Sequence, residues 1–127
     1  LRRKWTHAYD AAFAELPHVV PLQRRSDVEC SYHLYVLRFA TERLGADRDQ
    51  IMSMLQERGV GIGIHFRPVH LHPFYRNKYG YRRGAFPVAE SAGDSVISLP
   101  LFPTMAEEEV DYVIRVVREL VVMAAKR

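Results

Sequence analysis

The chain has 127 residues, of which 48% are hydrophobic and 26% are charged. This balance is typical of one folded domain with its own core, and it argues against a disordered chain. The net charge is only +3 and part of it lies at the two termini, so it does not favour a nucleic-acid-binding protein.

The cysteine content and the hydropathy indicate in which compartment the protein is found and whether it contacts a membrane. Cys30 is the only cysteine, which excludes an intrachain disulfide and is typical of a reducing compartment. No apolar run reaches the roughly 18 residues that a membrane span needs, and the first residues do not read as a secretion signal. We therefore expect a cytoplasmic protein without membrane contact. Because the chain begins with Leu1 rather than Met, we also expect it to come from something longer.

The first half of the chain predicts two helices and one strand. Residues 2–16 carry apolar side chains at helical spacing, and Pro17 ends the pattern. Residues 18–30 read as irregular. Residues 31–39 are rich in aromatic and β-branched residues on both faces, which predicts a central strand covered on both sides. A second helix is then expected to start after Asp47, which can form a capping box with Gln50. Gly59 is expected to end this helix.

The second half predicts a strand over 60–66, short helices over 73–79 and 88–96, and a brief strand over 97–99. The final helix is expected to start from a capping box of Thr104 and Glu107. This order of elements favours an α+β fold. We expect a single domain over 1–127, a small sandwich of about three β-strands with helices packed on one face.

The densest group of chemically useful side chains lies in the His-rich loop, residues 65–72. It contains His65, His70, His72 and Arg67. The histidine spacing lacks the nearby cysteines of a zinc site, so metal binding is a weak alternative. Each histidine has a structural interpretation as well, in which it only forms hydrogen bonds with carbonyl groups of the loop. Arg67 has a corresponding structural interpretation, in which it forms an ion pair at an interface. The glycines before the loop end a helix and enter a strand, which is the reverse of a dinucleotide-binding motif.

Several segments in this order carry a family resemblance. They are ERGVGIGIHF (57–66), PVHLHPFY (68–75), YGY (79–81), FPVAE (86–90) and SLPLFP (98–103). Together they resemble the C-terminal part of the DegT/DnrJ/EryC1/StrS sugar aminotransferases, over almost the whole chain. The family uses pyridoxal 5′-phosphate (PLP) to move an amino group, usually from glutamate, onto a nucleotide-linked keto-sugar.

The resemblance implies the fold of the C-terminal small domain of these PLP-dependent transferases. Residues 1–17 would be a connecting helix, and residues 18–127 would be the small domain. The implied partners are a large PLP-binding domain and a second subunit of a homo-oligomer, here a dimer, with no nucleic acid. By the same resemblance, the substrate-side contacts are His65, Phe66, Arg67 and His70.

The family's catalytic lysine has no counterpart in this sequence. The lysines are Lys4, Lys78 and Lys126, and none lies in a stretch resembling the family's lysine motif. We therefore expect this chain to bind no PLP alone and not to transaminate. Two hypotheses follow: a fragment of a sugar aminotransferase, or an independent binding or assembly module on the same fold. A connecting helix separated from its large domain should expose apolar surface, whereas a stand-alone module should not.

Overall fold

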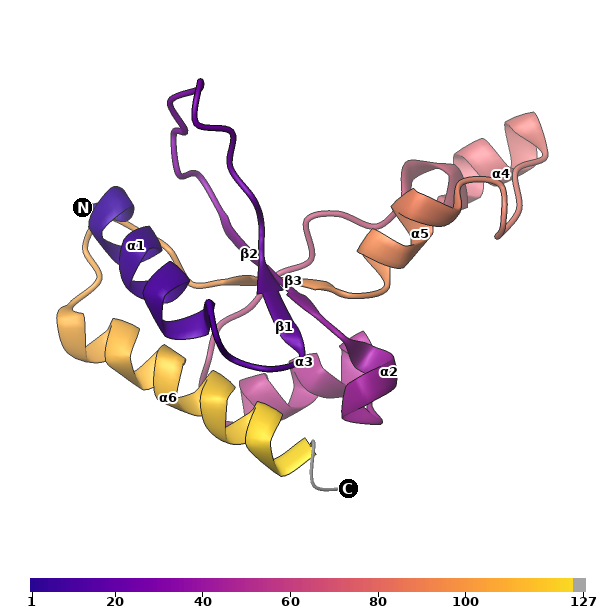
Figure 1. The fold of residues 1–127 in the computed structure, drawn as a ribbon. Helices are drawn as coiled ribbons and strands as arrows, with labels where there is room; N and C mark the ends of the chain where they lie inside the picture. The colour runs from indigo at the N-terminus through magenta and orange to yellow at the C-terminus, as the bar shows by residue number, and fades with distance from the viewer. Residues whose placement is uncertain (125–127) are drawn as a thin grey trace.

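The computed structural model describes residues 1–124 and shows three strands and six α-helices in that part of the chain (Figure 1). The strands are β1 (Val19–Pro21), β2 (Tyr35–Phe39) and β3 (Val96–Leu99). The helices are α1 (Arg2–Phe13), α2 (Thr41–Leu44), α3 (Arg48–Glu57), α4 (Pro73–Tyr79), α5 (Pro87–Gly93) and α6 (Glu107–Ala124), with a 3₁₀ turn η1 (Val69–Leu71). The predicted α+β class is confirmed.

The sheet is antiparallel throughout, in the order β1-β2-β3. Val19 pairs with Phe39 across β1 and β2, and Tyr35 pairs with Leu99 across β2 and β3. β2 is therefore the central strand that the sequence predicted, although it starts at Tyr35 rather than at residue 31. β1 lies inside the segment 18–30 that was predicted to be irregular.

The prediction that β2 is covered on both faces was wrong. Tyr35, Leu37 and Phe39 are almost fully buried in the core that α1, α3 and α6 complete. On the other face Val36 is half-buried and Arg38 is exposed. The second face of β2 is therefore only partly covered, although Ser98 and Val96, which pair with Val36 and Arg38 on that face, are buried.

Helix α1 is part of this core. Its buried face carries Trp5, Tyr9 and Phe13, and it packs against β1 and α6. The Tyr9 hydroxyl donates a hydrogen bond of 3.0 Å to the Pro100 carbonyl oxygen. Burial, with a smaller contribution from Glu109, raises the pKa of Tyr9, so this donor stays protonated.

The two predicted capping boxes have different outcomes. At α3 the box is confirmed, because Asp47 Oδ1 accepts from the Gln50 amide and Gln50 Oε1 accepts from the Asp47 amide, each at 2.8 Å. At α6 the prediction was wrong. The helix begins at Glu107, so Glu109 occupies the third helical position and accepts from the Ala106 amide at 2.8 Å.

The predicted strand over 60–66 is reduced to a single bridge between Gly63 and Ser98. Alternate glycines weaken a strand because they offer no side chains to pack, and this segment has them at Gly61 and Gly63. The helix predicted over 73–79 is confirmed as α4. The helix predicted over 88–96 ends earlier, at Gly93, and Val96 already belongs to β3.

The segment 69–93, here called the arm, contains η1, α4 and α5 and extends away from the sheet and its helices (Figure 1). It is predominantly exposed. Within residues 1–124, no helix is both long enough and apolar enough to cross a bilayer.

Candidate functional site

The loop that carries His65 is fixed to the edge of the sheet next to β3. The Gly63 amide donates to the Ser98 carbonyl at 3.0 Å, and the Ser98 amide donates back to the Gly63 carbonyl at 2.9 Å. His65 Nδ1 forms a hydrogen bond of 2.9 Å with the Ser98 hydroxyl. The half-buried His65 ring is thus held by backbone and side-chain contacts to one buried serine.

Gly63 makes room for this ring. A Cβ added at Gly63 would lie 2.7 Å from His65 Cε1, which is too close unless the imidazole moves. Gly63 lets the histidine ring lie directly on the backbone two residues earlier, whereas a Cβ at Gly61 would meet no atom within 4 Å.

Phe66 and Arg67 follow His65 and point toward solvent. Phe66 is 73% exposed, and its ring meets the His65 ring edge-to-face at a centroid distance of 4.9 Å. The peptide bond between His65 and Phe66 is cis. Arg67 is exposed and lines a wide cavity with other arginines. Three of the four predicted site residues are therefore consecutive at one sheet edge.

His70, the fourth predicted site residue, has different surroundings. It is only 7% exposed, and its Nε2 lies 2.8 Å from Glu90 Oε1. The Glu90 carboxylate also accepts from the Gly84 amide at 2.8 Å and from the Phe86 amide at 3.2 Å. The Gly84 bond, then the Phe86 bond and His70, lower the pKa of Glu90, and burial only partly opposes this. This buried network ties η1 to α5 and the turn before it.

Sequence reasoning missed Ser98 and Glu90 as partners of the two histidines. Each had a local signal. Ser98 is the only polar residue in the fully buried strand VISL, and Glu90 is a carboxylate on the largely apolar helix PVAESAG. A buried polar side chain requires a hydrogen-bond partner, but the identity of that partner depends on the fold.

Aromatic rings cover one side of the arm. Tyr79 lies near Tyr75 and Tyr81, with centroid distances of 6.2 Å and 5.8 Å, and Tyr81 meets Phe86 at 5.4 Å. With His70 they line a shallow pocket of about 560 Å³. The pocket is apolar and open, as expected of a surface that contacts another molecule.

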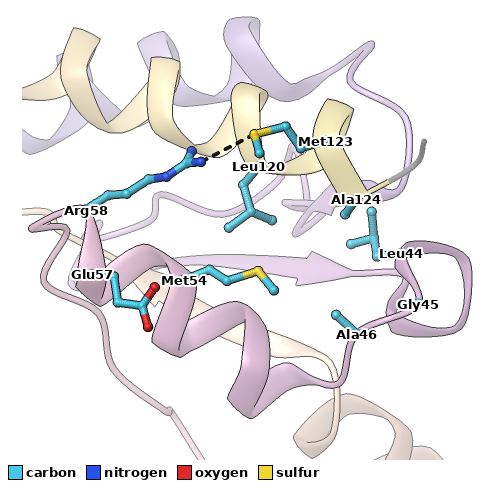
Figure 2. Close-up of a pocket in the computed structure, with 9 residues that line it drawn as sticks. All are labelled: Leu44, Gly45, Ala46, Met54, Glu57, Arg58, Leu120, Met123 and Ala124. Atoms are coloured by element: carbon cyan, nitrogen blue, oxygen red, sulfur yellow. Dashed lines mark hydrogen bonds between the residues drawn. The ribbon is translucent and has the colours of Figure 1, made fainter. Parts of the chain in front are cut away.

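A second hollow lies between the α2–α3 segment and the C-terminal half of α6 (Figure 2). It measures about 270 Å³, and its lining is mainly apolar. An Arg58 Nη2–H donates to Met123 Sδ across 3.4 Å, as the dashed line in Figure 2 shows. None of the predicted site residues borders it, so we interpret it as a packing defect beside the core.

Metal binding finds no support in the part of the chain that the structure describes. No group of three or more His, Cys, Asp or Glu side chains converges there in a way that could hold an ion. Cys30 is exposed and unpaired in residues 1–124.

Comparison with known proteins decides the family. The model of the DegT/DnrJ/EryC1/StrS aminotransferase family matches residues 1–118. The chain belongs to this family. The match covers α1, the sheet, the arm and most of α6, which confirms the resemblance read from the sequence motifs.

Similar proteins include the spore coat polysaccharide biosynthesis protein SpsC of Bacillus subtilis (strain 168), which is 36% identical over 114 residues. Among solved structures, the PLP form of Spr1654 from Streptococcus pneumoniae, assigned as a sugar aminotransferase, has a TM-score of 0.84 at 28% identity. S. venezuelae DesV, solved with a ketimine intermediate, has a TM-score of 0.82 at 30% identity.

These matches cover most of this chain but a minor part of each relative. The match covers 89% of this chain and 29% of SpsC. For Spr1654 the corresponding shares are 97% and 31%, and for DesV they are 94% and 31%. The chain therefore spans about 30% of the length of these relatives.

The lysines in residues 1–124 do not fit the role of a PLP-binding lysine, which needs a desolvated amine. The Lys4 side chain is 58% exposed and pairs with Glu107 at 2.9 Å. Lys78 is also exposed, and its amine lies over the Phe74 ring at 5.3 Å from the centroid. Lys126, the third lysine, lies outside the described residues.

Proposed function

We propose that this chain forms the sugar-facing part of a PLP-dependent aminotransferase, and that the lysine-bearing domain lies outside it. The reaction would transfer an amino group from glutamate to a nucleotide-linked keto-sugar used in cell-surface polysaccharide or antibiotic-sugar biosynthesis. Family membership supports the reaction class. The names of SpsC and Spr1654 support the sugar substrate. In this proposal residues 18–127 are the small domain and residues 1–17 the helix that leads into it.

The observation that carries the site assignment is the anchoring of His65. Its Nδ1 is engaged by Ser98 at 2.9 Å, while the next residue, Phe66, is 73% exposed. The other edge of the fixed His65 imidazole lies beside the exposed Phe66 ring. Together the two rings are suited to hydrogen bonding and stacking with a sugar. Arg67 adds a cation, and we propose that His70 supports the same surface through its bond to Glu90.

Replacing His65 tests this assignment. In a polypeptide that joins this chain to a lysine-bearing domain of the family, we expect His65→Ala to reduce kcat/KM for the keto-sugar by roughly 10–100-fold, with PLP binding retained. Phe66→Ala should act in the same direction. His33→Ala, at an exposed position on the segment before β2, is the matched control. Unchanged steady-state kinetics for both loop variants would remove the assignment.

A second experiment tests whether the catalytic lysine is elsewhere. When the 127-residue chain is mixed with PLP and reduced with borohydride, we expect no lysine to be labelled selectively, because the described lysines are exposed. Mass spectrometry after proteolysis reads the label at each lysine. Stoichiometric labelling of one lysine, together with amino-group exchange by the chain alone, would contradict the proposal.

The exposed apolar surface supports the proposed partners. Val88 is 84% exposed, Phe74 61% and Val69 58%, all on the arm. Surfaces of this kind mark contacts with other domains or subunits, so we propose that the arm packs on a large domain or on the second subunit of a dimer. Helix α1 does not expose the apolar surface expected of a connecting helix, because its apolar residues Trp5, Tyr9 and Phe13 are buried in the core. The exposed apolar residues of the arm are therefore what supports the aminotransferase part over the independent module. We also propose a cytoplasmic location, which the lone, unpaired Cys30 supports.

A further inference from the structure

The contact between Ser98 and His65 can form in two ways, which differ in where the imidazole carries its proton. Ser98 is only 4% exposed, and its Oγ lies 2.9 Å from His65 Nδ1. Either the hydroxyl donates to a bare Nδ1, or an Nδ1–H donates to the hydroxyl oxygen. A neutral imidazole carries its proton on Nε2 in the first case and on Nδ1 in the second.

The hydrogen bonds around Ser98 favour the first arrangement. Its backbone amide and carbonyl are both paired with Gly63, at 2.9 Å and 3.0 Å. Among residues 1–124, the Ser98 hydroxyl has one hydrogen-bond partner, which is His65. If Nδ1–H were the donor, the buried hydroxyl hydrogen would have no acceptor in that part of the chain, and buried donors rarely stay unpaired. If the hydroxyl donates to Nδ1, this buried donor is satisfied.

The neighbouring backbone and side chain confine the His65 ring. A Cβ at Gly63 would lie 2.7 Å from its Cε1 atom, and the Phe66 ring meets it edge-to-face at a centroid distance of 4.9 Å. These contacts help to keep Nδ1 on Ser98. His65 Nε2 has no partner among the described residues, and it is not one of the buried unpaired polar atoms there. Nε2 is therefore the nitrogen that a ligand can reach.

We propose that Ser98 is a positioning residue that holds His65 in its Nε2–H form, so that His65 offers a hydrogen-bond donor to the substrate. A donor recognises an acceptor oxygen, such as the carbonyl oxygen of a keto-sugar, whereas a bare Nε2 would require a donor such as a hydroxyl group. The substrate half of this inference rests on the proposed function. The position of the proton does not.

This arrangement also limits what His65 can do chemically. In the Nε2–H form the only free lone pair of the ring is on Nδ1, and the Ser98 hydroxyl occupies it. A general base must accept a proton at an atom that the substrate reaches. His65 in this form therefore binds and orients the substrate and does not remove a proton from it.

Nitrogen-15 NMR of the imidazole rings in the 127-residue chain tests the position of the proton. The spectrum is recorded at about pH 8, where free imidazole is neutral, and loss of one set of signals in His65→Ala identifies the ring. We expect the ratio of Nε2–H to Nδ1–H to be at least about tenfold higher for His65 than for His33, which is exposed. Equal ratios in these two rings, or an Nδ1–H ring at His65, would overturn the proposal without a Ser98 variant.

Removing the hydroxyl tests whether Ser98 is the cause. Ser98→Ala should bring the His65 ratio back to that of His33, and Ser98→Cys, which keeps a weak donor, should give an intermediate ratio. Ser95→Ala is the matched control, because it removes a buried hydroxyl that bonds to the Ser91 carbonyl instead. It should leave the His65 ratio unchanged. A ratio that stays high in both Ser98 variants would contradict the role of Ser98.

Kinetics separate this inference from the proposed function. In the polypeptide joined to a lysine-bearing domain, Ser98→Ala should lower kcat/KM for the keto-sugar about fivefold, and Ser95→Ala should not. A selected Nε2–H form with unchanged turnover in both His65→Ala and Ser98→Ala would overturn the proposed function and the substrate half of this inference. Reduced turnover in His65→Ala without a selected Nε2–H form would overturn only the role of Ser98.

Discussion

Replacing Phe13 with alanine is expected to lower the free energy of unfolding by about 3–5 kcal/mol. Phe13 ends α1 and is fully buried, with Tyr9 stacked on it at 5.8 Å and Tyr35 of the sheet at 6.3 Å. Its truncation would leave a cavity between α1 and β2. Since small domains have only about 5–15 kcal/mol of stability, the effect is large. Urea unfolding followed by circular dichroism measures it.

Phe74→Ala is the matched control, because it removes the same side chain from a position that is 61% exposed. We expect it to change stability by less than about 0.5 kcal/mol. If Phe13→Ala does not fold, Phe13→Leu retains much of the apolar volume and should cost about 1–2 kcal/mol. Equal stabilities for the Phe13 and Phe74 variants would show that α1 is only a connector and not part of the core.

The elements that sequence reasoning located correctly depend on local interactions. The Asp47 and Gln50 capping box closes within four residues, and the apolar stripe of α6 repeats along one helix. These signals need no knowledge of the rest of the fold. The prediction of the α6 cap was wrong for an equally local reason. It placed the start of the helix a few residues too early, and Glu109 rather than Glu107 accepts the hydrogen bond at the helix start.

The elements that were missed depend on pairing across the fold. β1 has three residues and includes a proline, so it is recognisable only once it pairs with β2. The segment 60–66 reads as a strand by its alternation, yet only Gly63 pairs, and the missing side chain of Gly63 leaves room for the His65 ring. An apolar pattern also does not show which faces are covered, which explains the error at Val36.

In the candidate site, too, the groups that are close in sequence were predictable and the groups that meet only in the fold were not. The consecutive residues His65, Phe66 and Arg67 were identifiable as a group because their proximity follows from the sequence. The pairing of His70 with Glu90 was not, because the two are 20 residues apart and meet only when the arm folds back on itself. The wide cavity that Arg67 lines likewise joins α3 to the arm, and no motif spans that separation.

Replacing Glu90 is expected to loosen the arm without unfolding the core. Glu90→Ala removes the acceptor shared by the Gly84 and Phe86 amides and by His70. Both bonds are only partly buried, and an amide without its acceptor loses its protection from solvent, so these two amides should exchange about tenfold faster or more. Hydrogen exchange measured by NMR reads each amide separately. Amides paired between β2 and β3 should keep their protection.

The pH dependence of stability separately tests the role of the Glu90 carboxylate. The pKa of Glu90 is lowered in the folded chain relative to its ordinary value of 4.5, so its ionised form favours folding. That stabilisation is fully present above pH 4.5 and is lost as the pH falls through the lowered pKa. The Tm difference between the native chain and Glu90→Gln should therefore be constant from neutral pH to about pH 5 and shrink below pH 4.5.

Thermal scans at several pH values measure this difference. Asp94 also has a lowered pKa, mainly through its hydrogen bonds to Arg83, and it is present in both proteins. Because the Glu90 charge raises the pKa of Asp94 as the smallest of its causes, the acid contribution of Asp94 cancels apart from this small effect. Glu15→Gln, at an exposed position after α1, is the matched control and should show no pH-dependent difference. A Glu90→Gln difference that persists unchanged into strong acid would mean that the side chain acts through packing rather than through its charge, and the ionised Glu90 carboxylate would have to be abandoned as the support of the arm.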